Sequence, residues 1–405
     1  MILTLADVSV GGKGSYGIAA SAVPYNENLH TYLRITDISD DGRLNCADLK
    51  SVDDPKAADY LLQPNDIVFA RTGASTGRNY FYDGTDGEFV YAGFLIKFSL
   101  DPHKINPQYV KYYCQSKDYK DWINSFNTGS TRGNINAQTL AKMPIPFLER
   151  EKQDALVSIL SVLDRKIANN EKINNNLEQQ AKSIFKSWFV DFDPFGGEQP
   201  SDMQLIPLKD LCKVITKGTT PTTLGKPFTS SGINFIKAES ILNNHSIDNG
   251  KFAYIDEETN MMLKRSIITA NDIVFTIAGT LGRFALVDES ILPANTNQAV
   301  AIIRPDTNKI TPSYLYSFFI GNWHNDYYSK RVQQAVQANL SLTTIKSLPI
   351  PVMNENEMSK YNELVSPLFA LMKSNEAENR TLAQIRDNLL PKLMSGELDV
   401  SEIDL

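Results

Sequence analysis

The sequence predicts an α+β fold: two tandem mixed α/β globules, each followed by a long helix, with the two helices packed as an antiparallel coiled coil. Two observations predict it. Short segments of the first half return in the second half at a nearly constant offset. Each half opens with about 150 residues rich in β-branched, aromatic and turn-forming residues, and then changes to a long helical pattern. The duplication gives the architecture a pseudo-two-fold internal symmetry.

Five segments carry the duplication, and they recur in the same order at offsets of 203 to 206 residues. The matched pairs are Leu5–Asp7 with Leu208–Asp210, Asn65–Phe69 with Asn271–Phe275, Gly77–Arg78 with Gly282–Arg283, Ile105–Tyr109 with Ile310–Tyr314, and Pro144–Pro146 with Pro349–Pro351. Chance can supply one such match, but not five in one order. The sequence therefore contains itself twice.

Within the globules, runs of β-branched and aromatic residues between turn residues predict strands, and x-Pro starts followed by apolar periodicity predict helices. The expected strands are Ile67–Phe69, Phe94–Ile96, Ile273–Phe275 and Val300–Ile303, and the expected helices are Tyr109–Trp122 and Tyr314–Tyr328.

The first long helix is expected from about Glu149 to Phe189, with a seam of apolar residues spaced by four and three. Adding 205 to each seam position gives a second seam in the same register, and both seams carry asparagine at the same two steps. Pro367 predicts a kink or a late start in the second helix. The residues expected to pair the helices are Leu163, Asn170, Asn174, Leu177, Leu368, Asn375, Asn379 and Leu382.

By itself, such a helix is typical of an oligomerisation stalk or of one long core helix. Two matching seams in one chain can instead pair with each other, and antiparallel pairing places the asparagines opposite one another. Buried amides that bond in this way fix the register of a coiled coil.

Composition indicates an ordinary globular protein of two or three domains. The 405 residues are 42% hydrophobic and 21% charged, and no apolar run approaches the roughly 20 residues that a membrane span needs. The first residues lack a signal-peptide pattern, and Cys46, Cys114 and Cys212 are widely spaced and odd in number. We therefore expect reduced thiols and a cytoplasmic location.

The net charge of −7 does not exclude a nucleic-acid partner. Four carboxylates lie in the last ten residues, which contain no basic residue, so much of the imbalance belongs to a short acidic tail. The local distribution of charge has to decide.

No catalytic constellation is visible. The four histidines are isolated, and no phosphate-binding loop or Gly-x-Ser-x-Gly motif is present. Phe192-Asp193-Pro194-Phe195 lacks the second proline of an amino-methyltransferase motif. We therefore expect a binding protein with no metal and no bound cofactor.

Each globule has a glycine-rich turn after its strongest strand, at residues 70–78 and 276–283, and a polar loop at residues 128–134 and 333–339. Exposed backbone N–H groups and a following arginine suit phosphate contact, whereas the simpler interpretation is a tight turn with a surface arginine. Arg78 and Arg283 are predicted to make such phosphate contacts at equivalent places in the two globules. The candidate nucleic-acid-binding residues are Lys13, Tyr16, Arg71, Thr72, Arg78, Ser130, Thr131, Arg132, Lys217, Thr219, Lys237, Thr280, Arg283, Gln334 and Gln337.

Two globules in tandem, the repeated Asn-Asp-Ile-Val-Phe and Pro-Ile-Pro motifs, and the ending Leu389-Leu390-Pro391-Lys392-Leu393-Met394-Ser395-Gly396-Glu397-Leu398 resemble the specificity subunit of Type I restriction–modification systems. The resemblance covers essentially the whole chain. It implies target recognition domains at residues 1–147 and 193–352, the latter including a linker, and spacer helices at 148–192 and 353–405, the latter including the acidic tail.

The resemblance further implies that each recognition domain reads one half of a split site in double-stranded DNA. The helices would dock two methyltransferase subunits, which hold S-adenosylmethionine, and restriction subunits would join later. One departure is the short segment before Leu5, so that residues 395–405 and 1–5 would together replace the linker between Val190 and Leu208 in a circular pseudo-repeat. The competing interpretation is a non-catalytic scaffold that holds two proteins without DNA specificity.

Overall fold

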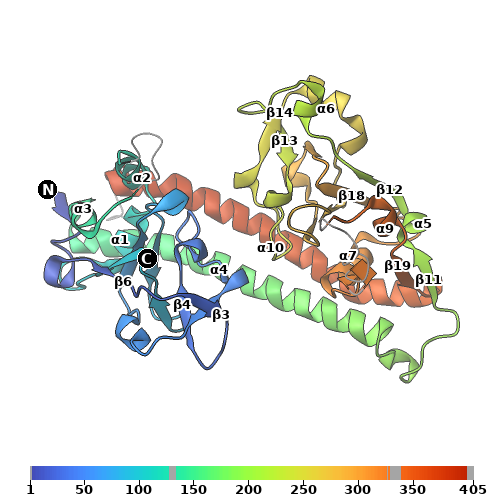
Figure 1. The fold of residues 1–405 in the computed structure, drawn as a ribbon, viewed down its shortest axis with the longest axis horizontal. Coiled ribbons are helices and arrows are strands. Elements are labelled where there is room, and N and C mark those ends of the chain that lie inside the picture. Colours follow the sequence, from blue (N-terminus) through green and yellow to red (C-terminus); the bar gives the residue numbers. More distant parts are fainter. Residues whose placement is uncertain (1, 127–133, 326, 329–338, 399–405) are drawn as a thin grey trace. The chain divides into compact units, whose positions relative to one another are not determined.

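The computed structural model describes residues 2–126, 134–325, 327–328 and 339–398. The chain divides into two compact units (Figure 1): residues 1–168 with 379–405, and residues 169–378. Each unit contains one globule and part of both long helices. No helix of the described residues is long and apolar enough to cross a membrane.

The first unit is built on two four-stranded sheets, ordered β2-β9-β6-β7 and β3-β5-β4-β8, and on the pair β1-β10. Among the strands that the structure describes in this unit, β4 and β8 pair in parallel and the others pair antiparallel. The strands are β1 (Ile2–Thr4), β2 (Ser15–Tyr16), β3 (Ala22–Pro24), β4 (His30–Leu33), β5 (Lys50–Val52), β6 (Asp66–Ala70), β7 (Asn79–Tyr82), β8 (Phe89–Tyr91), β9 (Leu95–Ser99) and β10 (Pro144–Pro146).

The second unit has the same arrangement without a counterpart of β3 among its described strands, in sheets ordered β12-β18-β15-β16 and β14-β13-β17, with the pair β11-β19. Of its described strands, β13 and β17 pair in parallel and the others pair antiparallel. The strands are β11 (Gln204–Pro207), β12 (Cys212–Lys217), β13 (Ile233–Ile236), β14 (Ala253–Ile255), β15 (Ile273–Thr276), β16 (Phe284–Leu286), β17 (Ala294–Thr296), β18 (Val300–Pro305) and β19 (Pro349–Val352).

The prediction of one helix over Tyr109–Trp122 is wrong, because two helices replace it. The Ser116 side chain accepts a hydrogen bond from the backbone N–H of Tyr119 and begins the second of them. The helices of the globules are α1 (Pro107–Tyr113), α2 (Lys117–Asn124), α3 (Ala137–Ala141), α5 (Leu208–Leu211), α6 (Glu257–Met262), α7 (Pro312–Ile320) and α9 (Leu342–Lys346).

The repeated Asn-Asp-Ile-Val-Phe motif builds the centre of each sheet. Asn65 and Asn271 have positive φ angles of 74° and 66°, which asparagine tolerates better than most residues. Asp66 is buried, accepts a hydrogen bond from the backbone of Gln63 at 2.8 Å, and pairs with Lys97 at 3.0 Å. Asp272 is buried in the same way, accepting from Thr269 and pairing with Arg304. The motif is therefore a structural one.

The repeated Pro-Ile-Pro and x-Pro-x-Tyr motifs contact each other. The hydroxyl of Tyr109 donates to the carbonyl of Pro146 at 2.9 Å, and that of Tyr314 donates to the carbonyl of Pro351. All four residues lie in or beside the buried core under the long helices. These contacts explain why the two motifs recur together.

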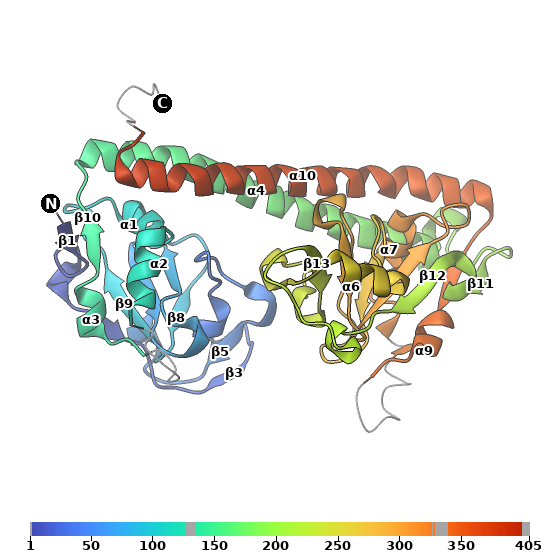
Figure 2. The same ribbon diagram turned by 90° about the horizontal axis from the view of Figure 1, so that it is seen from above.

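The long helices are α4 (Arg150–Phe189) and α10 (Glu355–Ser395). In the first unit, Leu156 and Leu160 of α4 share a core with Leu390 and Leu393 of α10. In the second unit, Phe185 and Trp188 pack against Tyr361. In both units, early residues of one helix thus meet late residues of the other, and the predicted antiparallel pairing is confirmed (Figure 2).

The amides of the seam bond across the helices. In the second unit, Asn375 Nδ2 donates to Asn174 Oδ1 at 2.8 Å, and Asn174 Nδ2 donates to the carbonyl of Met372 at 3.2 Å. Asn170 Nδ2 donates to Glu378 Oε2 at 2.7 Å. The remaining residues expected to pair the helices are buried or half-buried: Leu163, Leu177, Leu368, Asn379 and Leu382.

The late start expected at Pro367 is wrong, because α10 begins at Glu355 and continues through the proline. Pro367 lies on the exposed side of the helix, and so does Glu363 one turn earlier. The carbonyl that loses its helical partner at Glu363 can therefore be hydrated, which lowers the cost of the proline.

Candidate nucleic-acid interface

The glycine-rich turns close the hairpins β6–β7 and β15–β16. Gly73 and Gly77 have φ angles of 74° and 88°, and Gly279 and Gly282 have 77° and 82°. Any other residue would strain the backbone at these positions. At Gly77 a side chain would also meet Ile123 at 2.4 Å. The glycines are thus explained by the turn itself.

Arg78 and Arg283 hold equivalent loops in the two globules. Arg78 Nη1 donates to the carbonyl of Ile38 at 3.2 Å and its Nε bonds to Asp40 at 2.6 Å. Arg283 Nη1 donates to the carbonyl of Ile241 at 3.2 Å. Both arginines are half-buried and remain partly accessible to solvent. Their contact with phosphate stays a prediction.

Tyr16 and Arg71 come together at one edge of the β2-β9-β6-β7 sheet. The Arg71 guanidinium carbon lies 5.1 Å from the centre of the Tyr16 ring, within the range of a cation–π contact. Tyr16 is 42% exposed, and its hydroxyl accepts a hydrogen bond from the backbone N–H of Ala137 at 3.2 Å. The sequence named both residues as candidates but gave no sign that they touch.

The second globule has the same backbone at this edge with different side chains. Tyr16 pairs with Ile96, which pairs with Phe69, and Lys217 pairs with Ala301, which pairs with Phe275. Since Phe69 and Phe275 are matched in the duplication, Lys217 takes the place of Tyr16.

By the same register, Ile277 takes the place of Arg71. The N–H groups of Arg71 and Ile277 donate to Phe94 and Ala299, and their carbonyls accept from Ile135 and Leu340. Ile277 is only 3% exposed and belongs to the core. The two globules therefore present different chemistry on one scaffold.

Two glycines at this edge were missed by the sequence analysis. A side chain at Gly17 would meet the carbonyl oxygen of Tyr91 at 2.2 Å, and one at Gly218 would meet that of Thr296 at 1.8 Å. Their separation of 201 residues departs from the common offset, which is why the pairs Tyr16-Gly17 and Lys217-Gly218 did not align.

The other candidates are scattered over the globules. Lys13 and Thr280 are exposed, and Thr219 is half-buried. Thr72 forms a bridge with Asn134, and Lys237 pairs with Glu239 at 2.5 Å. The candidates in the polar loops lie outside the described residues: Ser130, Thr131, Arg132, Gln334 and Gln337.

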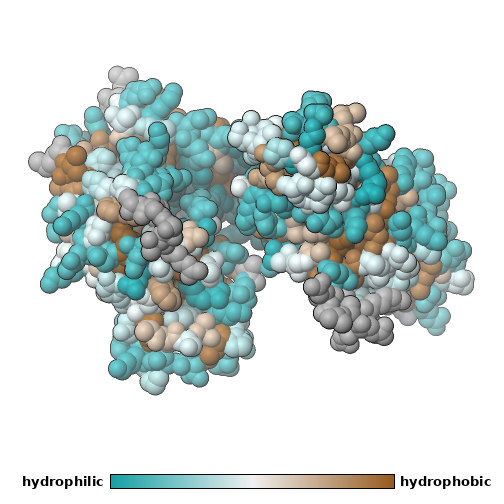
Figure 3. Space-filling view, turned by 45° about the horizontal axis from the view of Figure 1, so that its top comes forward, coloured by the Kyte–Doolittle hydropathy of each residue, from teal (hydrophilic) through white to brown (hydrophobic). Residues whose placement is uncertain are grey.

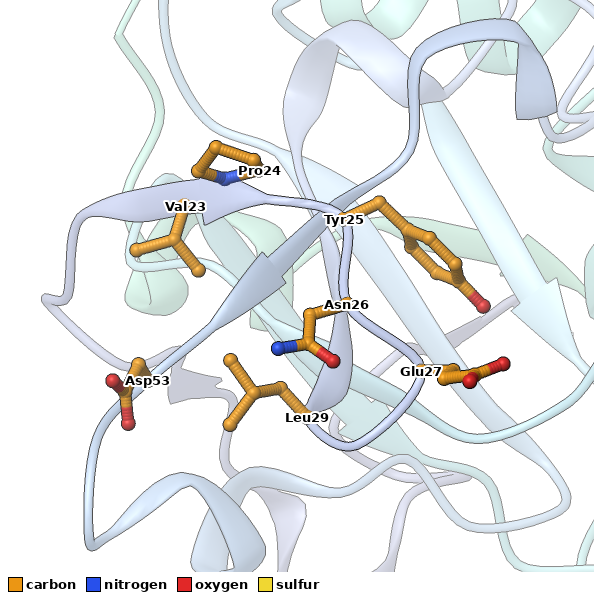
Figure 4. A pocket seen from close by; sticks show the side chains of 7 residues that line it. All are labelled: Val23, Pro24, Tyr25, Asn26, Glu27, Leu29 and Asp53. Carbon is orange, nitrogen blue, oxygen red and sulfur yellow. The ribbon is translucent and has the colours of Figure 1, made fainter.

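A shallow depression in the first globule is acidic instead. Figure 4 shows Glu27 and Asp53 on opposite sides of it, with Val23, Asn26 and Leu29 between them. Asp54 and Glu88 line the adjoining hollow. Carboxylates repel phosphates, so this surface is unsuited to DNA.

Two buried histidines lie inside the second globule. His324 is fully buried with no hydrogen bond at either ring nitrogen among the described residues, and burial lowers its pKa to about 3. His245 stacks on Phe284 at 4.1 Å, and burial lowers its pKa to about 4. Its Nε2 lies 3.8 Å from Glu178 of α4. Both histidines are neutral at pH 7 and belong to an aromatic core.

Within the described residues, no cluster of histidine, cysteine, aspartate and glutamate could hold a metal ion. Figure 3 shows hydrophobic side chains in small groups between hydrophilic ones on the face displayed. Such a surface offers polar and apolar contacts over an area rather than one deep pocket.

Comparison with known proteins agrees with the geometry. The family described as "Type I restriction modification DNA specificity domain" matches residues 31–179 and 200–386. The MjaIX specificity subunit of Methanocaldococcus jannaschii is 25% identical, over 73% of this chain and 70% of its own. The HindI specificity subunit of Haemophilus influenzae is 23% identical, over 91% and 94%.

A solved S subunit of a Type I restriction–modification system from M. genitalium has the same fold. It superposes with a TM-score of 0.53 at 18% identity, covering 97% of this chain and 95% of that one. The match of the family to both halves confirms the resemblance inferred from the repeated motifs. This chain belongs to the family of Type I restriction–modification DNA specificity subunits.

Proposed function

We propose that this chain is the DNA-recognition subunit of a Type I restriction–modification complex, in which each globule reads one half of a bipartite site. The observation that carries the proposal is the sheet edge built twice with one backbone and two sets of side chains. Tyr16 and Arg71 occupy it in the first globule, and Lys217 and Ile277 occupy it in the second. A common scaffold with divergent edges suits the reading of two different half-sites.

We also propose that the long helices bind two methyltransferase subunits, with restriction subunits joining that complex. Several apolar side chains on α4 and α10 are exposed, and they support this role. Exposed apolar surface on a soluble protein commonly marks a site where another protein binds. The exposed side chains are Val162 and Ile173 on α4, and Leu364, Leu371 and Ile385 on α10. The chain itself is proposed to be non-catalytic, and S-adenosylmethionine is assigned to the methyltransferase subunits.

The test is DNA binding by the chain in complex with its methyltransferase subunits. The complex should retard a duplex that contains two half-sites at one fixed gap, and binding should weaken steeply with salt because phosphates are contacted. Genome methylation with and without this gene identifies the site to be used. Binding that ignores sequence and gap length would contradict the proposal.

The alternative function is a scaffold that holds two proteins without DNA specificity. It predicts stable binding of partner proteins and the same genomic methylation pattern with and without this chain. A deletion that abolishes methylation at a bipartite sequence therefore separates the two functions.

A further inference from the structure

Arg71, at the sheet edge where it meets Tyr16, differs from the other arginines described in the first globule in having no carboxylate partner among the described residues. Residues 2–147 contain four arginines that the structure describes. Arg34, Arg43 and Arg78 pair with aspartates at 2.6, 3.1 and 2.6 Å. Arg71 makes no ion pair within the described part of the globule, although a partly buried cation normally finds one.

Arg71 is nevertheless held in one orientation. Its backbone is bonded on both sides, to Phe94 at 3.0 Å and to Ile135 at 2.9 Å. Its guanidinium lies against the Tyr16 ring, and its Nε is inaccessible to water without a hydrogen-bond partner among the described residues. With Nε inside, the terminal amino groups remain to bind something beyond the globule.

A fixed planar guanidinium suits a ligand that presents two acceptors in one plane. In the major groove of DNA, guanine does so with O6 and N7, and arginine is its commonest specific partner. A phosphate can also accept two N–H groups of one guanidinium, but such a contact positions the protein on DNA and carries no sequence information. The edge of guanine presents its two acceptors in one fixed plane, so the holding of the guanidinium by the Tyr16 ring favours this contact.

We propose that Arg71, oriented by Tyr16, reads a guanine in the half-site of the first globule. This deepens the proposed function and rests on it. The second globule has no arginine at the equivalent position, because Ile277 stands there and is in the core. The two half-sites are accordingly read by different chemistry, and only one of them depends on this contact.

The experiment compares methylation motifs made by the complete complex of wild type, Arg71→Ala and Arg71→Lys, using duplexes with each base pair of the site varied in turn. One G·C pair in a single half-site should be favoured about 5- to 150-fold by wild type. Arg71→Ala should accept any base there, and Arg71→Lys should keep a weaker preference. The other half-site should be read unchanged by all three.

Tyr16 gives a test that leaves charge unaltered. Tyr16→Phe keeps the ring and should keep the motif, whereas Tyr16→Leu should lower the guanine preference by about 2- to 5-fold at the same base pair. Arg43→Ala is the matched control, since it removes an arginine that is paired with Asp41 in the same globule, and its motif should equal that of wild type. Thermal melting of each variant checks that the globule is folded.

Three results would overturn the assignment to Arg71. One is a motif unchanged by Arg71→Ala. Another is weaker binding to all sequences, with a salt slope shallower by about one that Arg71→Lys restores, which identifies a phosphate contact. The third is lost selectivity in the opposite half-site. A wild-type complex that methylates without sequence preference would instead contradict the proposed function itself.

Discussion

Arg386 of α10 reaches Asp164 of α4 across the helix pair of the first unit, with 3.1 Å between Nη1 and Oδ1. Lys111 and the hydroxyl of Tyr112 converge on the other carboxylate oxygen. In the second unit, the duplicated positions are Ala181 and Phe369, which pack in an apolar core. The α4–α10 pair thus carries a charge network in the first unit and an apolar contact at the duplicated positions of the second unit.

Arg386→Met should destabilise the protein by about 2–3 kcal/mol, because the half-buried carboxylate of Asp164 then loses its partner on α10. Arg165→Met, which removes an exposed arginine from α4, is the control and should cost under about 0.5 kcal/mol. Urea unfolding measures both. The double variant Asp164→Asn, Arg386→Met should lose less than the sum of the two single changes; strict additivity would show that the pair is not coupled.

Burial raises the pKa of Asp164, but Lys111, Arg386 and the Tyr112 hydroxyl outweigh burial and leave the pKa below its ordinary value. The folded-state pKa is lower than the unfolded one, so the network stabilises above the unfolded pKa and fails as pH falls through the folded pKa. The difference in the free energy of unfolding between wild type and Arg386→Met should therefore be smaller in strong acid than at neutral pH.

Arg78→Ala and Arg283→Ala should weaken DNA binding about equally for correct and incorrect sequences, and each should reduce the salt slope by about one. The tethers to Ile38 and Ile241 also predict a lower melting temperature for both variants. Electrophoretic mobility shifts at several salt concentrations, combined with melting curves, measure both effects. An altered methylation motif would mean that the residue reads bases, and a changed melting temperature with an unchanged salt slope would restrict it to the tether.

The buried histidines of the second globule predict that the folded protein loses stability in mild acid. Burial lowers the pKa of His245 and His324 to about 4 and 3. The unfolded chain therefore binds more protons below pH 6.5, and stability should fall there by about 1.4 kcal/mol per pH unit for each histidine. Glu178 opposes this trend, because burial raises its pKa.

His324→Leu isolates one histidine. It removes two buried nitrogens that have no hydrogen-bond partner among the described residues, so it should preserve stability at pH 7 and flatten the decline between pH 6 and 4. Denaturation midpoints over that range provide the measurement. An unchanged pH profile would show that His324 is not the group that titrates.

Matched insertions of one heptad into α4 near Asn170 and into α10 near Asn375 should lengthen the gap between half-sites. Seven helical residues add roughly 10 Å, or about three base pairs of B-DNA. An insertion into α4 alone would slide its seam past α10 and separate Asn174 from Asn375, so that variant should be unstable. Methylation mapping reads the gap directly; a folded double insertion that keeps the original gap would show that the helices do not measure the site.

The architecture could be predicted from the sequence because its segments recur in both halves and its long helices have a regular apolar spacing. Seam residues such as Leu156 and Leu393 are buried as the spacing predicted, and both Asn-Asp-Ile-Val-Phe segments lie in or lead into central strands. Pro367 misled the expectation of a late start, because periodicity does not tell which side of a helix can tolerate a lost hydrogen bond.

The sheet edge where Tyr16 and Arg71 meet could be predicted only in part, because its residues differ between the two halves of the sequence. Tyr16 and Arg71 are 55 positions apart and meet through sheet register, which composition does not encode. The charge of Arg386 is likewise visible in the sequence, but its partner Asp164 follows only from the antiparallel alignment of the helices.

The completion of the first unit by residues 379–405 has a consequence for biosynthesis. Leu156 and Leu160 leave the ribosome more than 200 residues before Leu390 and Leu393, with which they share a core. The nascent first globule must therefore wait, with that strip of its helix uncovered, until translation of the second globule has ended. During this interval the strip is open to wrong pairing or to a chaperone, so a chain that stops short of α10's last turns would be expected to release an incompletely covered helix.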